Sequence, residues 1–377
     1  MELTKTAPKR ERILYIDVLE TIAILLVVYC HYSYTKGDSS LAQIIQLWSF
    51  SLCVPLFLMA NGALLFNHSF DLKKHLIRTG QLLLAVTVWR ILYLIAAGLV
   101  QPERFIQLPA QQIFEYILGY SLTDMEVPAD HFWYLYTLVT LYLVFPVLKK
   151  FFDTGDRKLY QYAVLVLFIL IYVLGGYDRF AVVLTQRTGF SLFSLQPLRE
   201  KLLPLGETTC FLFFFLLGPL LHEKFYLKKE ERSNKWIIPM ILLNLGSLAL
   251  LCAEKIISGG SLLDNWEIWQ DNYSRLATLG LAVSLYVLCA YIPWPSSMKL
   301  VPFISKRTMN IYCIHMLLSY LWIVWIWPIW SFENLFLHWI KVLFIVALSI
   351  VVTEIITYIP GLAWITAVSP NHTKKHH

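Results

Sequence analysis

Hydrophobic residues in this chain gather in ten long runs that are separated by polar segments. Each run approaches the roughly 20 residues that a helix needs to cross the hydrocarbon core of a bilayer. The alternating pattern of an outer-membrane β-barrel strand is absent from the sequence. The pattern therefore predicts an all-α, polytopic membrane protein with about ten transmembrane helices, near residues 14–35, 43–66, 80–100, 131–148, 159–176, 207–222, 236–254, 274–293, 308–329 and 338–359.

Basic residues are divided unevenly between the segments that join these runs. Most of the 31 lysines and arginines lie in alternate segments, starting with the N-terminal one, and such enrichment marks the cytoplasmic side. The bias predicts a multi-pass protein of the plasma membrane with the N-terminus and the C-terminus inside. We expect a basic tail over residues 1–13, one transmembrane domain over 14–359 and a C-terminal tail over 360–377.

Composition agrees with this class and excludes several others. Hydrophobic residues make up 58% of the chain and charged residues only 15%, against about 25% charged in globular domains. The six cysteines form no CxxC pair, so neither a disulfide framework nor a metal site is expected. The net charge of +6 follows from the topology, and no basic run interleaved with aromatic residues indicates a nucleic-acid partner.

The first span carries three ionisable residues on one face. At 100° per residue, His31 lies about 20° from Glu20 and about 40° from Asp17 around the helix. Charged residues inside a span are costly and usually face the interior of the bundle, so this stripe is a candidate catalytic site. A neutral imidazole near the membrane boundary can accept a proton from a hydroxyl group near pH 7. A structural histidine that bonds to a carbonyl group is the alternative.

Other candidates lie near the predicted outer side. His131 begins the fourth span and is followed by Trp133 and Tyr134, which are candidates for binding a substrate. Aromatic residues beside acidic loops suit a sugar, although an interfacial aromatic belt is the simpler interpretation. His315 in the ninth span lines the same cavity or, alternatively, packs there with a hydrogen bond between helices.

Two basic features lie elsewhere in the chain. Lys74, His75 and Arg78 open the third span on the predicted cytoplasmic side, where they suit the phosphates of a donor such as coenzyme A or simply anchor the helix. Arg90 should lie near the middle of the membrane, where an arginine needs a carboxylate or a wet cavity. We expect a buried ion-pair cluster in which Arg90 meets Glu354, Glu20 or Asp17, with a structural or a catalytic role.

Four stretches together resemble the acyltransferase-3 family of integral membrane acyltransferases. They are Ile16–His31, Pro55–Gly62 with the basic opening of the third span, His131–Pro146 and Ile304–His315, and they are spread over most of the chain. The resemblance implies acetyl-CoA as a cytoplasmic acyl donor, a hydroxyl acceptor outside and a histidine on the first span as the base, which His31 matches.

The resemblance also exposes a departure from the family pattern. The family has an arginine eleven residues before this histidine, where the present chain has Glu20. One interpretation is that Arg90 supplies the missing charge from a neighbouring helix. The family's Arg-x-x-Arg element appears here as His75-Leu-Ile-Arg78, in which only Arg78 is retained.

The leading hypothesis is an acetyl-CoA-dependent O-acyltransferase that acetylates an extracellular or lipid-linked glycan, with His31 as general base. Its expected partners are membrane lipids and the glycan acceptor, and the sequence leaves a homo-oligomer open. The alternatives are a small-solute transporter or exporter, and a membrane protein of the same fold that has lost catalysis.

Overall fold

The computed structural model describes most of the chain, namely residues 12–32, 40–122, 125–203, 206–228, 234–257, 272–325, 335–359 and 363–366. These residues form helices and no strand. Eight of the helices are long and apolar enough to cross a membrane, and α13 is a shorter apolar helix. The prediction of an all-α, polytopic membrane protein is confirmed. Nearly all of the two predicted tails, and most of the segment between the predicted spans at 236–254 and 274–293, lie outside the described residues.

The main helices fall on the ten predicted runs. They are α1 (Leu14–Tyr32), α2 (Ser40–Phe66), α3 (Leu72–Val100), α6 (Trp133–Asp153), α7 (Arg157–Phe168), α10 (Thr209–His222), α11 (Ile237–Ile257), α13 (Leu276–Tyr291), α15 (Thr308–Trp325) and α16 (Leu335–Thr357).

Two of these helices extend much further than the hydrophobic runs that predicted them. The third begins at Leu72 because Asp71 caps it, its carboxylate accepting the backbone N–H of Lys74. The fifth passes through a π-helical turn at Ile169–Val173 into α8 (Leu174–Thr188), twelve residues beyond its predicted end at 176. A polar sequence continues a helix there, so hydropathy alone underestimates its length.

Short helices occupy the connections. Those in the predicted outer loops are α4 (Pro102–Gln107), α5 (Ala110–Leu118), the 3₁₀ turn at Asp130–Phe132 and α9 (Gln196–Leu202). At the opposite end of the bundle, α14 (Leu300–Ser305) leads into α15, and α17 (Ala363–Thr366) follows α16. The predicted outer segments are therefore partly helical.

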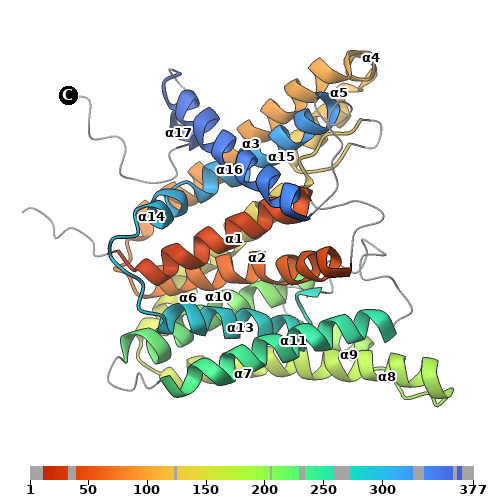
Figure 1. Ribbon diagram of the computed structural model, residues 1–377, viewed down its shortest axis with the longest axis vertical. Helices are drawn as coiled ribbons and strands as arrows, with labels where there is room; N and C mark the ends of the chain where they lie inside the picture. The colour runs from red at the N-terminus through yellow and green to blue at the C-terminus, as the bar shows by residue number, and fades with distance from the viewer. Residues whose placement is uncertain are drawn as a thin grey trace, which may run out of the picture.

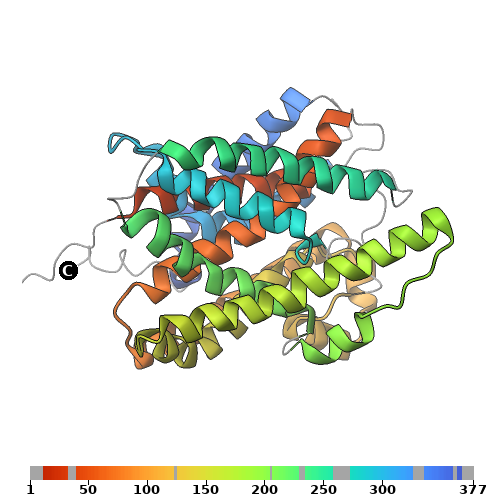
Figure 2. The same ribbon diagram turned by 90° about the horizontal axis from the view of Figure 1, so that it is seen from below.

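Helix α1 lies inside the bundle. It packs on α2 along one side and on α14, α15 and α16 along the other (Figure 1). Helices α10 and α13 cover the next face of α2, and α11 covers α13. Helix α3 packs on α6 and also contacts α15. The view from below shows α8 extending past the neighbouring helices at one end of the molecule (Figure 2).

Glycines bring α2 and α10 unusually close together. A Cβ atom at Gly218 would lie 2.0 Å from the carbonyl oxygen of Met59, and one at Gly62 would lie 2.0 Å from that of Phe215. Small residues at such positions let two helix backbones approach directly, which is how packing is gained where lipid removes the hydrophobic driving force. This contact holds α2 in place behind α1.

We expect Gly218→Ala to destabilise the protein by about 1–3 kcal/mol, because the added methyl group must push the α2 backbone away. Gly80→Ala is the matched control, since nothing lies within 4 Å of its Cβ position, and alanine should be neutral or slightly stabilising in that helix. Thermal unfolding in detergent, followed by tryptophan fluorescence, measures both. Equal midpoints for the two variants would contradict the close contact.

Candidate functional site

His31 lies in the last turn of α1, where its side chain is partly buried. Its Nδ1 atom is 2.8 Å from the carbonyl oxygen of Val27, one turn earlier in the same helix. A carbonyl oxygen can only accept, so Nδ1 carries the hydrogen in this contact. The other ring nitrogen, Nε2, then has the lone pair in the neutral imidazole.

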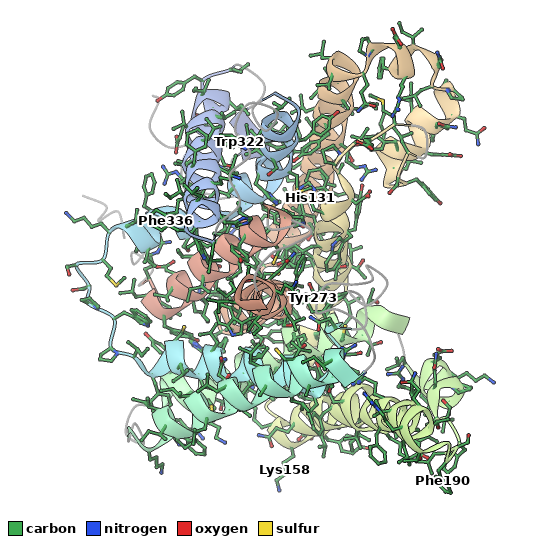
Figure 3. The ribbon with its side chains drawn as sticks, turned by 45° about the vertical axis from the view of Figure 1, so that its right-hand side comes forward. His131, Lys158, Phe190, Tyr273, Trp322 and Phe336 are labelled. Carbon is green, nitrogen blue, oxygen red and sulfur yellow. The ribbon has the colours of Figure 1, made fainter. Side chains whose placement is uncertain are left out.

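Two further histidines surround this ring. The ring centroid of His315 on α15 is 5.1 Å from that of His31, and the centroid of His131 is 6.1 Å away. His131 and His315 are themselves 5.1 Å apart, so the three rings form a triangle. Figure 3 labels His131 near the centre of the molecule. Three residues that the sequence indicated separately, from three different spans, are therefore brought together. We call them the histidine cluster.

His131 is the least satisfied member of this cluster. Only 4% of the residue is exposed, and neither ring nitrogen has a hydrogen-bond partner within the described part of the chain. Its backbone is held firmly, because the Tyr312 hydroxyl donates to its carbonyl oxygen. A buried polar group without a partner costs about 1–3 kcal/mol, which indicates that a ligand or a water completes the site.

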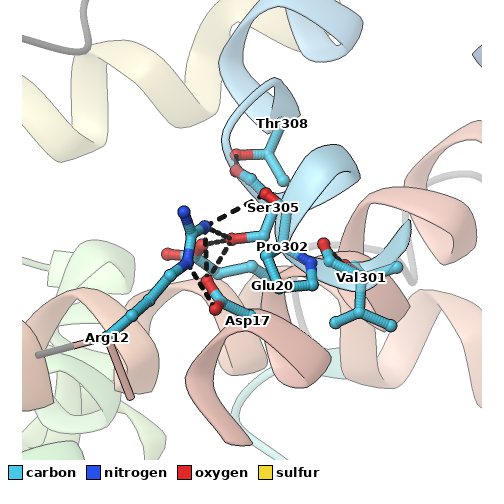
Figure 4. A network of polar contacts seen from close by, with 8 residues as sticks. Arg12, Asp17, Glu20, Val301, Pro302, Ser305 and Thr308 are labelled. Carbon is cyan, nitrogen blue, oxygen red and sulfur yellow. Dashed lines mark hydrogen bonds and ion pairs between the residues drawn. The ribbon is translucent and has the colours of Figure 1, made fainter. Parts of the chain in front are cut away.

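Asp17 and Glu20, the other two residues of the stripe, lie at the other end of α1. Asp17 is 5% exposed, and its carboxylate accepts two hydrogen bonds from Arg12, with Nε–Oδ2 at 2.5 Å and Nη2–Oδ1 at 2.7 Å. The Ser305 hydroxyl at the end of α14 lies 2.8 Å from Asp17 Oδ1 and 2.6 Å from Glu20 Oε2 (Figure 4). We call these four residues the carboxylate cluster.

The number of hydrogens available in the carboxylate cluster indicates which of its carboxyl groups is protonated. The Ser305 hydroxyl has one hydrogen, so it can donate to only one of the two carboxyl groups. Both carboxylate oxygens of Asp17 already accept hydrogen bonds from the guanidinium of Arg12, so Asp17 has no hydrogen to donate to Ser305. Both Ser305 contacts are satisfied when Glu20 is the neutral acid that donates to Ser305, which in turn donates to Asp17. The cluster then has no net charge.

The prediction that Arg90 pairs with a carboxylate was wrong. Its Nε and Nη2 atoms donate to the carbonyl oxygens of Tyr116 and Tyr120, each at 2.6 Å, and its guanidinium lies 4.2 Å from the centre of the Tyr116 ring. Tyr116 lies in the last turn of α5, where carbonyl groups carry partial negative charge, and Tyr120 lies two residues beyond the end of that helix. Arg90 is thus satisfied by the backbone at the end of a helix.

Glu354, another predicted partner of Arg90, is also engaged elsewhere. Its Oε1 atom accepts from Arg307 Nε at 2.7 Å and from Arg307 Nη2 at 2.5 Å, which ties α16 to the start of α15. Neither Arg90 nor Glu354 joins the carboxylate cluster. Among the described residues, no carboxylate pairs with Arg90.

The basic opening of α3 divides into two faces. Lys74 and Arg78 are exposed, whereas His75 is buried and its Nε2 donates to the carbonyl oxygen of Tyr142 on α6 at 2.7 Å. The Lys74 backbone N–H and its ammonium, 3.1 Å away, lower the pKa of the Asp71 carboxyl group below its usual value. The structure therefore does not bring His75 together with Lys74 and Arg78.

The two aromatic candidates differ in their surroundings. Trp133 is 40% exposed, and its ring packs near Phe211 and Tyr273 at centroid distances of 5.2 and 6.3 Å. Tyr134 is buried beside Tyr312. Of these two residues, Trp133 is the one with an accessible ring. No group of side chains in the described ranges has the arrangement of a metal site.

Three residues in or beside these clusters were not singled out from the sequence: Arg12, Ser305, and Tyr93 on α3, whose ring centroid is 5.6 Å from that of His131. Arg12 was assigned to the basic tail, and no helical spacing links it to Asp17 because it lies before the first turn of α1. Ser305 and Tyr93 are ordinary residues for a membrane helix, and only their three-dimensional position gives them polar partners. A search for any cation near the start of α1, besides those inside spans, would have found Arg12.

Comparison with known proteins places the chain in a family. A family model described as an acyltransferase domain, that of the acyltransferase-3 family, matches residues 13–358. No curated protein and no solved structure matches the chain. The matched region contains the histidine cluster, every membrane-spanning helix described above, and all of the carboxylate cluster except Arg12, which directly precedes it. This agrees with the resemblance seen in the sequence. The chain belongs to the acyltransferase-3 family of membrane acyltransferases.

Proposed function

We propose that this protein transfers an acyl group, such as acetyl, from acyl-CoA on the cytoplasmic face to a hydroxyl group of an extracellular or lipid-linked glycan. The histidine cluster is the observation that carries the proposal. It places an imidazole whose Nε2 lone pair is free beside a second, buried imidazole with no hydrogen-bond partner in the described chain. Those are the two groups that acyl transfer to an alcohol requires, a base and an oxyanion donor.

The reaction follows from these two roles. Nε2 of His31 takes the proton of the acceptor hydroxyl group while the oxygen of that hydroxyl attacks the thioester carbonyl carbon. The resulting oxyanion accepts a hydrogen bond from the N–H of His131. When the carbon–sulfur bond breaks, the thiolate leaves and takes the proton from His31 Nε2. The products are an ester and a free thiol, and the base is regenerated.

Donor and acceptor approach from opposite ends of α1 in this proposal. His31 and Glu20 are eleven residues apart, which is about 16 Å along a helix. Lys74 and Arg78, exposed at the predicted cytoplasmic side, are the groups proposed to hold the phosphates of the donor. Trp133, with its accessible ring, is proposed to stack on the glycan. Tyr134, buried on α6, and His75, which joins α3 to α6, are proposed to support these helices.

Substituting His31 with Ala should lower acyl transfer by about 10²–10⁴-fold, the contribution typical of a general base. The measurement is the release of free thiol from acetyl-CoA by protein in liposomes, together with base-labile acetate on the surface glycans of cells that express it. His68→Ala, in the turn between α2 and α3, is the matched control and should retain activity. Undiminished acetylation by the His31 variant would rule out the assignment of His31 as the base.

The carboxylate cluster supports a second proposal about the family arginine. Positions 17 and 20 are neighbours on one face of a helix, so an arginine at position 20 would lie beside Asp17. In this chain Arg12 reaches the same carboxylate from outside the helix. We propose that Arg12 acts in place of the family arginine, with Glu20 as its neutral neighbour, and that Arg90 has no part in this.

This proposal makes a prediction for three variants. Arg12→Gln should lower the free energy of unfolding by about 1–3 kcal/mol, less than for a fully buried ion pair because water surrounds part of Arg12. It should also lower activity, because Asp17 loses its partner. Glu20→Arg should also lower both, since two cations would share one carboxylate. The double variant Arg12→Gln/Glu20→Arg should recover much of the loss. Thermal unfolding and thiol release measure these effects. Higher activity for Glu20→Arg alone would show that Arg12 does not replace the family arginine.

A further inference from the structure

The Tyr93 hydroxyl is inserted into the backbone of α15 beside His315. It donates to the carbonyl oxygen of Cys313 at 2.9 Å and accepts the N–H of Leu317, also at 2.9 Å. These two backbone groups are four residues apart, so they would bond to each other in a regular α-helix. A side chain from α3 therefore bridges the turn of α15 that carries His315.

His315 is completely buried within this turn, and its protonation is defined by its neighbours. Its Nδ1 atom lies 2.8 Å from the carbonyl oxygen of Tyr312 and 3.2 Å from that of Ile311. Both neighbours are acceptors, so Nδ1 carries the hydrogen. In the neutral ring, Nε2 of His315 is then a bare acceptor, and it points toward His31.

The contact between the two histidines follows from this. Nε2 of His315 lies 3.4 Å from Nδ1 of His31, the same atom that meets the Val27 carbonyl oxygen. Two acceptors thus face Nδ1 of His31 from different helices. If His31 held its hydrogen on Nε2 instead, three lone pairs would meet at this point. The arrangement favours one tautomer, with the hydrogen on Nδ1.

We propose that His315, held by Tyr93, is a positioning residue that fixes His31 in the tautomer whose Nε2 is free to accept a proton. His315 does not touch the reacting groups. His315 acts through His31, because its Nε2 atom presents a second acceptor to Nδ1 of His31. This acceptor comes from α15, whereas the Val27 carbonyl comes from the same helix as His31. Tyr93 acts one step further away by holding the turn of α15 from which His315 projects.

The tautomer is measured directly by ¹⁵N solid-state NMR on full-length protein in liposomes. The chain has ten histidines, so the His31 signals are assigned by their loss in His31→Gln. Wild-type His31 should give a single neutral tautomer with the hydrogen on Nδ1. The variant His315→Leu should give a mixture of both tautomers. His315→Gln, whose amide oxygen can accept at the position of Nε2, should restore the single tautomer.

Two hydroxyl variants test the role of Tyr93. Tyr93→Phe removes the hydroxyl from α15 and should shift the His31 tautomers in the same direction as His315→Leu. Tyr320→Phe is the matched control, because its hydroxyl also joins α15 to the end of α3, through Gln101, but lies outside the histidine cluster. This control should leave the spectrum unchanged.

Activity provides a second measurement, which rests on the proposed function. His315→Leu should lower kcat at least about tenfold, within the range of a general base, and leave the KM for acyl-CoA within about twofold. His315→Gln should recover most of kcat. A single His31 tautomer in His315→Leu would overturn the inference. If the wild-type protein transfers no acyl group, the proposed function fails, but the tautomer measurement still decides the role of His315.

Discussion

The need to satisfy polar groups on a buried helix organises this structure. Helix α1 carries acids, a threonine and a histidine into an apolar bundle, where an unpaired charge or donor is expensive. One short segment, residues 301–315, partners all of them. It accepts from Thr21 and Arg12 through the carbonyls of Val301 and Pro302, bonds to both carboxyl groups through Ser305, and meets His31 through His315.

This shared partner also explains why the two clusters lie where they do. Because α14 and α15 run alongside α1, one helix boundary places Ser305 near Asp17 and another turn places His315 near His31. The glycine contact between α2 and α10 supports the opposite side of α1. The stripe on α1 is thus held from both sides along its length, and its two ends can serve different chemical tasks.

The helices and the stripe on α1 could be predicted from the sequence, but the hydrogen-bond partners of Arg90, Arg12 and Tyr93 could not, because those partners are set by the three-dimensional packing. Hydropathy predicted the helices, and the cost of buried charge singled out Asp17, Glu20 and His31, which the structure places in the two clusters. The partner of Arg90 was mispredicted because a carboxylate or a wet cavity was expected, whereas backbone carbonyls beside a helix end serve equally well. Arg12 and Tyr93 could not be found from periodicity, since the residues they bond belong to other turns or other helices.

The long separation in sequence between α1 and its partner segment has a consequence for biosynthesis. Ser305 follows Asp17 by 288 residues, which at about 5–20 residues per second takes roughly 15–60 s to synthesise. During that time the first helix enters the membrane with its acids and histidine unmatched by Ser305 and His315. Arg12, made five residues before Asp17, is already available to pair with that carboxylate, whereas Glu20 and His31 must be satisfied by water or other polar groups until the last helices arrive.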